Sequence, residues 1–266
     1  MKKMFALGLG LIVSLKPSLG AMMYSGNGDT TGGGAVGTGS LTLTDNGTTL
    51  FGTFTRGGGT FTEVLVIFID SKSGGFQDTH TFTDDSTALR RGVSGYQGGN
   101  RSNAIFVNGF LADYAIALRP FSISGADGYD RLFQLGSGTF TSLGGVNLAP
   151  VASTSSSTYT FSIALSDIGV APGGSFRIET DLVRADGQQH YLESFETFDL
   201  DPDKSDMSNM VTFNSSHTYV TAVPEMTNGA LAVFGGIFLA CGALTHAARA
   251  KKAKRDGDRN ARKQLN

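Results

Sequence analysis

The residues with the clearest capacity for chemistry are four aspartates in one acidic stretch: Asp199, Asp201, Asp203 and Asp206. Alternating carboxylates in a turn can converge on one hard cation, and calcium takes such oxygens as ligands. An EF-hand loop would have glycine at its sixth position and glutamate at its twelfth, where this chain has Lys204 and Met210. The stretch therefore predicts either a calcium site of another geometry or a solvated acidic loop, in which Pro202 ends the pairing of the strand before it.

Motifs that define a particular enzyme class are absent from the sequence. It contains no His-Glu-x-x-His, no Gly-x-Ser-x-Gly and no Walker sequence. The pairs Asp84 with Asp85 and Glu193 with Glu196 could serve glycoside hydrolysis, but nothing distinguishes them from the other carboxylates. We therefore expect a non-catalytic protein with no cofactor other than the calcium considered above.

Aromatic side chains that could stack on a sugar ring are restricted to tyrosine and phenylalanine, because the chain has no tryptophan. Tyr96, Tyr129 and Tyr191 are the candidates, whereas Tyr114 and Tyr159 lie in apolar segments and are expected in the core. Tyrosines at loop positions are ordinary surface residues, so the sequence assigns no sugar site.

A glycine-rich segment, 32–37, matches the dinucleotide-binding pattern by letters alone. That pattern has meaning only between a strand and a helix, and neither is expected here. The segment is predicted to be the flexible N-terminal part of the mature protein.

Segments that alternate apolar and hydroxyl residues predict β-structure in the middle of the chain. Residues 40–44 and 49–55 flank Asp45-Asn46-Gly47, whose central residues tolerate positive φ, so they predict a β-hairpin. The continuous apolar run 64–69 predicts a strand buried on both faces. Further strands are expected at 104–110, 113–118, 131–135, 139–143, 157–165, 175–183 and 191–200, with a short helix around 86–93. The pattern indicates an all-β fold, a single β-sandwich of jelly-roll type over residues 22–222.

The N-terminal residues 1–21 have the features of a secretory signal peptide. Lys2 and Lys3 precede an apolar run, 4–15, and small residues follow at 18–21. The run would rise only about 18 Å as a helix, too little for a hydrocarbon core of about 30 Å. Signal peptidase is therefore expected to cleave after Gly20 or Ala21 and the protein to be exported.

Residues 226–248 contain no formal charge at neutral pH and would span about 35 Å as a helix, enough to cross a bilayer once. The basic residues that follow are Arg249, Lys251, Lys252, Lys254 and Arg255. Such a cluster stays on the cytoplasmic side. The sequence predicts a single-pass protein with its domain outside the cytoplasm and residues 256–266 as a cytoplasmic tail.

Charge is distributed unevenly along a chain whose formal net charge is only −2. Residues 21–222 contain ten Lys and Arg against twenty Asp and Glu. Arg90, Arg91 and Arg101 are too few in such an acidic domain to make a nucleic-acid surface. Nucleic acid is therefore excluded as the expected partner.

The triplet Val223-Pro224-Glu225, the apolar segment and the basic cluster together resemble the PEP-CTERM sorting signal of Gram-negative bacteria. The resemblance covers residues 223–255, with Met226 where the family usually has a second proline. It implies recognition by an exosortase, a membrane-embedded cysteine transpeptidase, in organisms that make exopolysaccharide or a biofilm matrix. Pro224 keeps the preceding residue extended, which suits a peptidase.

The order of segments in the middle, with the phrases at 112–118 and 165–169, is similar to sandwiches of the DOMON and carbohydrate-binding superfamily. Some members of that superfamily bind sugars and some bind haem through Met and His. His80, His190 and His217 occur here without a partner motif and are interpreted as surface histidines. We expect a surface or matrix protein anchored until processing, with a carbohydrate-binding module or carbohydrate-active enzyme as the alternative.

Overall fold

The computed structural model describes residues 21–121, 127–184, 190–197 and 210–223, together with Arg249 and Lys251. The chain divides into two units, residues 1–223 and 224–266. Within the first unit the described residues form an all-β fold of antiparallel sheets with one short α-helix.

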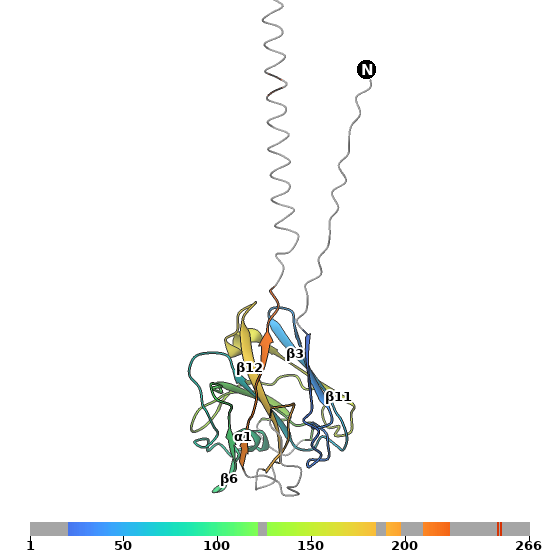
Figure 1. Ribbon diagram of the computed structural model, residues 1–266, viewed down its shortest axis with the longest axis vertical. Helices are drawn as coiled ribbons and strands as arrows, with labels where there is room; N and C mark the ends of the chain where they lie inside the picture. Colours follow the sequence, from blue (N-terminus) through green and yellow to red (C-terminus); the bar gives the residue numbers. More distant parts are fainter. Residues whose placement is uncertain are drawn as a thin grey trace, which may run out of the picture. The chain divides into compact units, whose positions relative to one another are not determined.

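The first sheet has four antiparallel strands in the order β1-β2-β3-β11 (Figure 1). These are β1 (Ala21–Ser25), β2 (Ser40–Asp45), β3 (Thr49–Thr55) and β11 (Thr158–Ala164). Successive side chains on a strand point to opposite faces. In β2, Leu41 and Leu43 are buried while the alternating Thr42 and Thr44 are partly exposed, so one face packs inward and the other meets solvent.

The second sheet has seven strands in the order β10-β9-β8-β4-β12-β13, with β15 also paired to β12. They are β4 (Val64–Asp70), β8 (Tyr114–Leu118), β9 (Asp130–Gln134), β10 (Thr141–Gly144), β12 (Ser175–Arg184), β13 (His190–Glu193) and β15 (His217–Val220). Every residue from Val64 to Ile69 is buried. The prediction of a strand covered on both faces is therefore confirmed.

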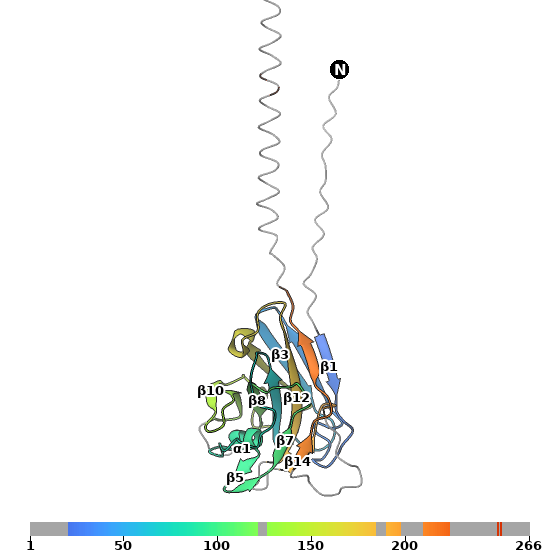
Figure 2. The same ribbon diagram turned by 60° about the vertical axis from the view of Figure 1, so that its left-hand side comes forward.

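Two apolar cores explain this double burial. The first lies between the sheets and includes Leu41 and Phe54 of one sheet with Leu65 and Ile67 of the other. The second lies on the opposite face of the seven-stranded sheet and includes Phe68. It is covered by α1 (Ala88–Ser94), β7 (Asn103–Ile105), β14 (Met210–Thr212) and their loops, with β14 parallel to β7 (Figure 2). A short hairpin, β5 (Tyr96–Gln97) with β6 (Asn100–Arg101), and the 3₁₀ turn η1 (Leu165–Ile168) complete the described elements.

The predicted hairpin forms with the expected turn. Thr44 lies opposite Phe51, and Gly47 has φ 85°, a conformation in which a side chain would be strained. The Gly47 amide donates to Asp45 Oδ1 over 2.7 Å. The helix expected around 86–93 also forms, capped by Thr87 and ended by Gly95 in the left-handed conformation.

Three of the predicted elements differ from the structure. The strand expected at 104–110 ends at Ile105, because the Phe110 amide bonds the Val107 carbonyl in a turn. The strand expected at 191–200 ends at Glu193, shortly before Glu196 with φ 54°. The prediction of a flexible segment at 32–37 was wrong, since Ala35 and Val36 have no exposed surface.

Candidate functional site

The site with the most direct bearing on function is the point at which the chain leaves the folded domain. Among the described residues of the domain, Ala222 is the last one held by backbone hydrogen bonds: its amide donates to Oδ1 and Oδ2 of Asp45 over 2.9 and 3.1 Å. The Tyr219 hydroxyl donates to Asp45 Oδ2 over 2.7 Å. Asp45 is fully buried, so these bonds form away from water. The hairpin turn therefore clamps the end of the domain.

The neighbouring turn reinforces this clamp. The Thr221 amide donates to the Gly174 carbonyl over 2.9 Å, and the Gly173 amide donates to the Ala222 carbonyl over 3.2 Å. Val223, the next residue, is 69% exposed. Of the predicted sorting triplet, Val223 thus stands free at the domain boundary, whereas Pro224 and Glu225 lie outside the described residues.

Most of the other predicted site residues fall outside the described ranges. The four aspartates of the acidic stretch, the apolar segment 226–248, and Lys252, Lys254 and Arg255 are among them. Arg249 and Lys251 are described, and both are helical and exposed. Within the described ranges the structure contains no apolar helix of membrane-spanning length. Among the same described residues, no group of three His, Cys, Asp or Glu side chains is arranged to bind a metal ion.

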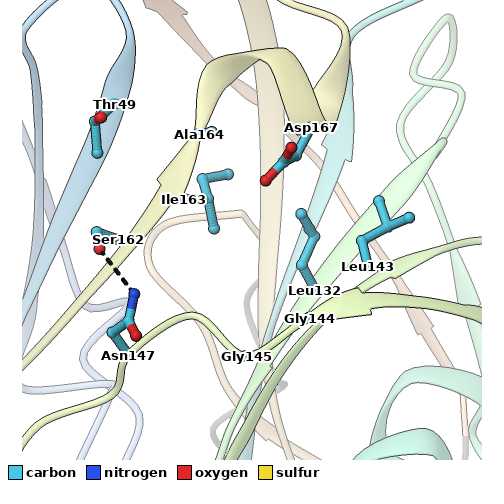
Figure 3. Close-up of a pocket in the computed structure, with 10 residues that line it drawn as sticks. All are labelled: Thr49, Leu132, Leu143, Gly144, Gly145, Asn147, Ser162, Ile163, Ala164 and Asp167. Carbon is cyan, nitrogen blue, oxygen red and sulfur yellow. Dashed lines mark hydrogen bonds between the residues drawn. The ribbon is translucent and has the colours of Figure 1, made fainter.

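An open cleft of about 250 Å³ lies between β11 and the β9–β10 hairpin (Figure 3). Leu132, Leu143 and Ile163 give it an apolar side, and Asn147 and Asp167 give it a polar one. A second open cleft of about 370 Å³ includes Asp70 and Arg177, which form an ion pair with each other. Each cleft contains a single carboxylate and no tyrosine. Neither supplies the carboxylate pair used to hydrolyse a glycosidic bond.

The tyrosines and histidines divide between core and surface. Tyr114 and Tyr159 are buried, as expected, but Tyr191 is also only 1% exposed, so it cannot stack on a sugar. His80 is exposed. His217 is partly buried instead, with its ring 4.4 Å from that of Tyr24, and the side chain of His190 lies outside the described set.

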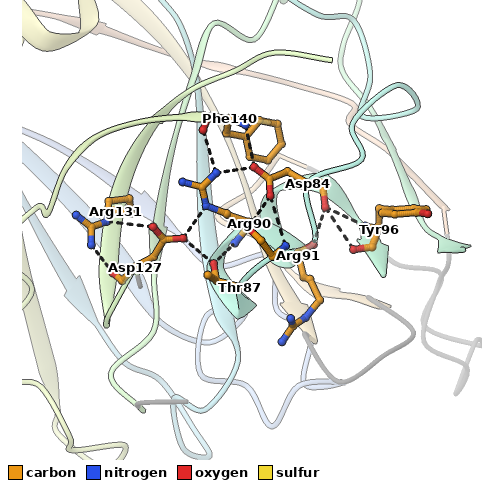
Figure 4. A network of polar contacts seen from close by, with 10 residues as sticks. Asp84, Thr87, Arg90, Arg91, Tyr96, Asp127, Arg131 and Phe140 are labelled. Carbon is orange, nitrogen blue, oxygen red and sulfur yellow. Dashed lines mark hydrogen bonds and ion pairs between the residues drawn. The ribbon is translucent and has the colours of Figure 1, made fainter. Parts of the chain in front are cut away.

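A buried ion-pair network links α1 to the second core (Figure 4). The Arg90 guanidinium donates from Nη1 to Asp84 over 2.5 Å and from Nε to Asp127 over 2.7 Å. Burial by itself raises the pKa of Asp84, but the Phe140 amide and the Arg90 guanidinium bond its carboxylate and lower the pKa overall. Burial by itself lowers the pKa of Arg90, and the two carboxylates raise it overall. Arg90 and Asp84 are therefore stabilised in their charged forms, and the network holds α1 against the loops that contain Asp84 and Asp127.

Replacing Arg90 with alanine is expected to lower the free energy of unfolding by about 3–5 kcal/mol, because the buried Asp84 would lose its cation. Asp127 would keep only its longer ion pair with Arg131, at 3.7 Å. Arg91, its partly exposed neighbour on the same helix, is the matched control, and R91A should cost less than about 1 kcal/mol. Urea unfolding of the two variants, followed by tyrosine fluorescence, measures both. Equal losses would mean that the helix, rather than the network, determines the effect.

A second buried carboxylate was not identified as structural from the sequence. Glu193 is fully buried, and its Oε1 accepts the Gly34 amide while its Oε2 accepts the amides of Val36 and Gly37, each over 2.7 Å. Successive backbone amides that converge in this way form an anion-binding concavity. The glycine-rich segment therefore wraps a carboxylate of its own chain, and Glu193 is unavailable for catalysis with Glu196.

Two further acidic side chains are buried on the central strand β12. Glu179 and Asp181 point to the same face and have no exposed surface. Glu179 Oε1 accepts the Val107 amide over 3.2 Å. Within the described part of the chain, Glu179 Oε2 and both Asp181 oxygens have no hydrogen-bond partner. Burial raises the pKa of Glu179 to about 9, so this side chain is protonated at neutral pH. Burial also raises the pKa of Asp181 well above its usual range and so favours its neutral form.

Comparison with known proteins gives no match: no family model, no curated protein and no solved structure is significantly similar to this chain. The functional interpretation therefore depends on the residues and the geometry described above.

Proposed function

We propose that this chain is an exported, non-catalytic protein of the cell surface or extracellular matrix, sorted through its C-terminal segment. Residues 1–21 act as a signal peptide, and residues 226–248 cross the membrane once. An exosortase-type transpeptidase acts at Val223-Pro224-Glu225, and the domain is a β-sandwich of jelly-roll type. These assignments follow from the sequence patterns and the PEP-CTERM resemblance.

The observation that carries the proposal is the position of Val223. The fold ends at Ala222, which is clamped to Asp45, and the following residue is 69% exposed. A peptidase binds an extended, accessible segment, so a motif that begins directly after the last clamped residue is well placed for recognition. The basic residues Arg249 and Lys251 are exposed, as a solvated cytoplasmic cluster requires.

The double substitution P224A/E225A is expected to block release of the domain from the membrane fraction, because the peptidase would lose its recognition residues. T227A/N228A, two changes of similar size just beyond the triplet, should leave release at the wild-type rate. Membrane fractionation with mass spectrometry of the released C-terminus measures both. Release of the P224A/E225A variant at the wild-type rate would refute the sorting assignment.

Two further predictions accompany this function. The acidic stretch from Asp199 to Asp206 remains a candidate calcium site, and exopolysaccharide remains a candidate partner of the domain in the matrix. The alternative function is a surface carbohydrate-binding module or carbohydrate-active enzyme, and the open cleft beside Asp167 is where we would first test for a bound sugar.

A further inference from the structure

Both ends of the described domain lie at one end of the fold. Ala21, the first described residue, lies opposite Thr44, and the next residue along, Asp45, binds the Ala222 amide. The rings of Tyr24 and His217 lie 4.4 Å apart, so β1 and β15 run close together. We call this end, defined by residues 21–22, 44–51, 169–174 and 220–223, the exit face.

The exit face presents several large apolar side chains to solvent. Met22 is 41% exposed, Phe51 42%, Val220 58% and Val223 69%. Phe51 lies opposite Thr44 and projects from the outer face of the first sheet, whereas Met22 lies opposite Leu43, whose side chain points into the first core. Val220 follows the buried Tyr219 and projects from the outer face of the second sheet. The exposed apolar side chains therefore surround this end of the domain on both sides, and such a grouping indicates a contact with something other than water.

Charged side chains are scarce on this face although the domain as a whole is acidic. The turns 46–48 and 169–174 contain none. Asp45 is buried in its hydrogen bonds, which leaves Asp167 and Lys72 as exposed charges of opposite sign beside the turns. The Ser71 hydroxyl, next to Lys72, donates to the Ile168 carbonyl over 2.6 Å and so holds these two segments together.

The connection to the apolar segment is short enough to keep the exit face close to a membrane. Ala222 is fixed by Asp45, and the apolar segment begins at Met226, four residues later. A fully extended chain spans about 3.5 Å per residue, so the gap is at most about 14 Å. The headgroup layer on one side of a bilayer is itself roughly 5–8 Å thick.

We propose that the exit face is a lipid-contacting surface that rests in the headgroup layer while the protein is anchored. The inference depends on the proposed membrane span, since the span determines which end of the domain meets the bilayer. Met22, Phe51, Val220 and Val223 contact the boundary between headgroups and acyl chains, where apolar side chains are stabilised. The near-absence of net charge on this face avoids repulsion from anionic lipids.

The test uses the full chain in vesicles of phosphatidylethanolamine and phosphatidylglycerol, with C241S to remove the native thiol. A fluorescent label is attached in turn to F51C and V220C on the exit face. The matched controls are I105C on β7 and M210C on β14, both exposed apolar positions that lie away from this end of the domain (Figure 2). Lipids with a nitroxide headgroup are expected to quench the first two labels several-fold more than the controls.

A second variant with twelve Gly and Ser residues inserted between Ala222 and Val223 keeps the domain and lengthens the tether. Its F51C and V220C labels should lose most of their quenching. Equal quenching at all four positions, in protein that resists carbonate extraction, would overturn the lipid contact while leaving the span intact. If the label at F51C is not quenched by lipid but becomes less accessible to solvent as the protein concentration rises, the exit face contacts a second copy of the chain. That result would also overturn the proposed lipid contact. Loss of the protein on carbonate extraction would instead refute the proposed span.

Discussion

Replacing Glu193 with alanine is expected to lower the free energy of unfolding by about 3–6 kcal/mol, the largest effect among the predicted substitutions. Three backbone amides donate to this carboxylate, and hydrogen bonds to charged groups contribute roughly 1.5–3 kcal/mol each. Without it, the buried amides of Gly34, Val36 and Gly37 would have no acceptor. Urea unfolding followed by tyrosine fluorescence is the suitable measurement, because the chain lacks tryptophan.

Glu196 provides the matched control for this substitution, because it is exposed and lies three residues away. E196Q should change stability by less than about 0.5 kcal/mol. Formate should partly restore the stability of E193A by occupying the vacated concavity, whereas chloride at the same ionic strength should restore less. A loss in E193A no larger than that in E196Q would contradict the structural role of the carboxylate.

The second large effect is a loss of stability as the pH rises. Burial raises the pKa of Glu179 to about 9 in the folded state, and Asp181 shifts in the same direction. The unfolded chain releases these protons near pH 4, so between pH 4 and 9 the folded state binds more protons than the unfolded one. The stability contributed by Glu179 is therefore fully present below about pH 4 and falls by roughly 1.4 kcal/mol per pH unit up to about pH 9, and Asp181 adds a loss of the same sign.

Neutral isosteres should remove most of this dependence. E179Q is expected to flatten part of the pH profile and to raise stability at pH 8 by on the order of 5 kcal/mol, because glutamine carries no ionisable proton. D181N is expected to act in the same direction for the same reason. D167N, at an exposed carboxylate, should leave the profile unchanged. Unfolding free energies measured from pH 4 to 9 test this, and a flat wild-type profile would show that these carboxylates are not buried as neutral acids.

Local patterns predicted the parts of the fold that depend on local physics. The hairpin from Ser40 to Thr55 follows from alternation and from the turn residues, and the double burial of β4 follows from its unbroken apolar run. The short helix expected around residues 86–93 forms as α1, and the structure shows Thr87 as its N-cap. These elements need no information from distant residues.

The candidate sites could not be predicted in this way, because distant residues define them. Residues 32–37 resembled a flexible segment because the carboxylate that orders them stands more than 150 positions later, at Glu193. Asp45 looked like an ordinary turn residue because its partner amide belongs to Ala222. Tyr191 was expected at the surface as a loop tyrosine. In the structure it belongs to β13, and its side chain lies in the second core, which α1 and the neighbouring loops cover.

The meeting of β1 with β15 also determines when the domain can fold. Tyr219 fills the first core with no exposed surface, and His217 contacts Tyr24 near the other end of the domain sequence. The core therefore stays incomplete until nearly the whole domain has been synthesised. Contacts of such long sequence separation form slowly. A chain of this design cannot complete its first core before residue 219 has left the ribosome.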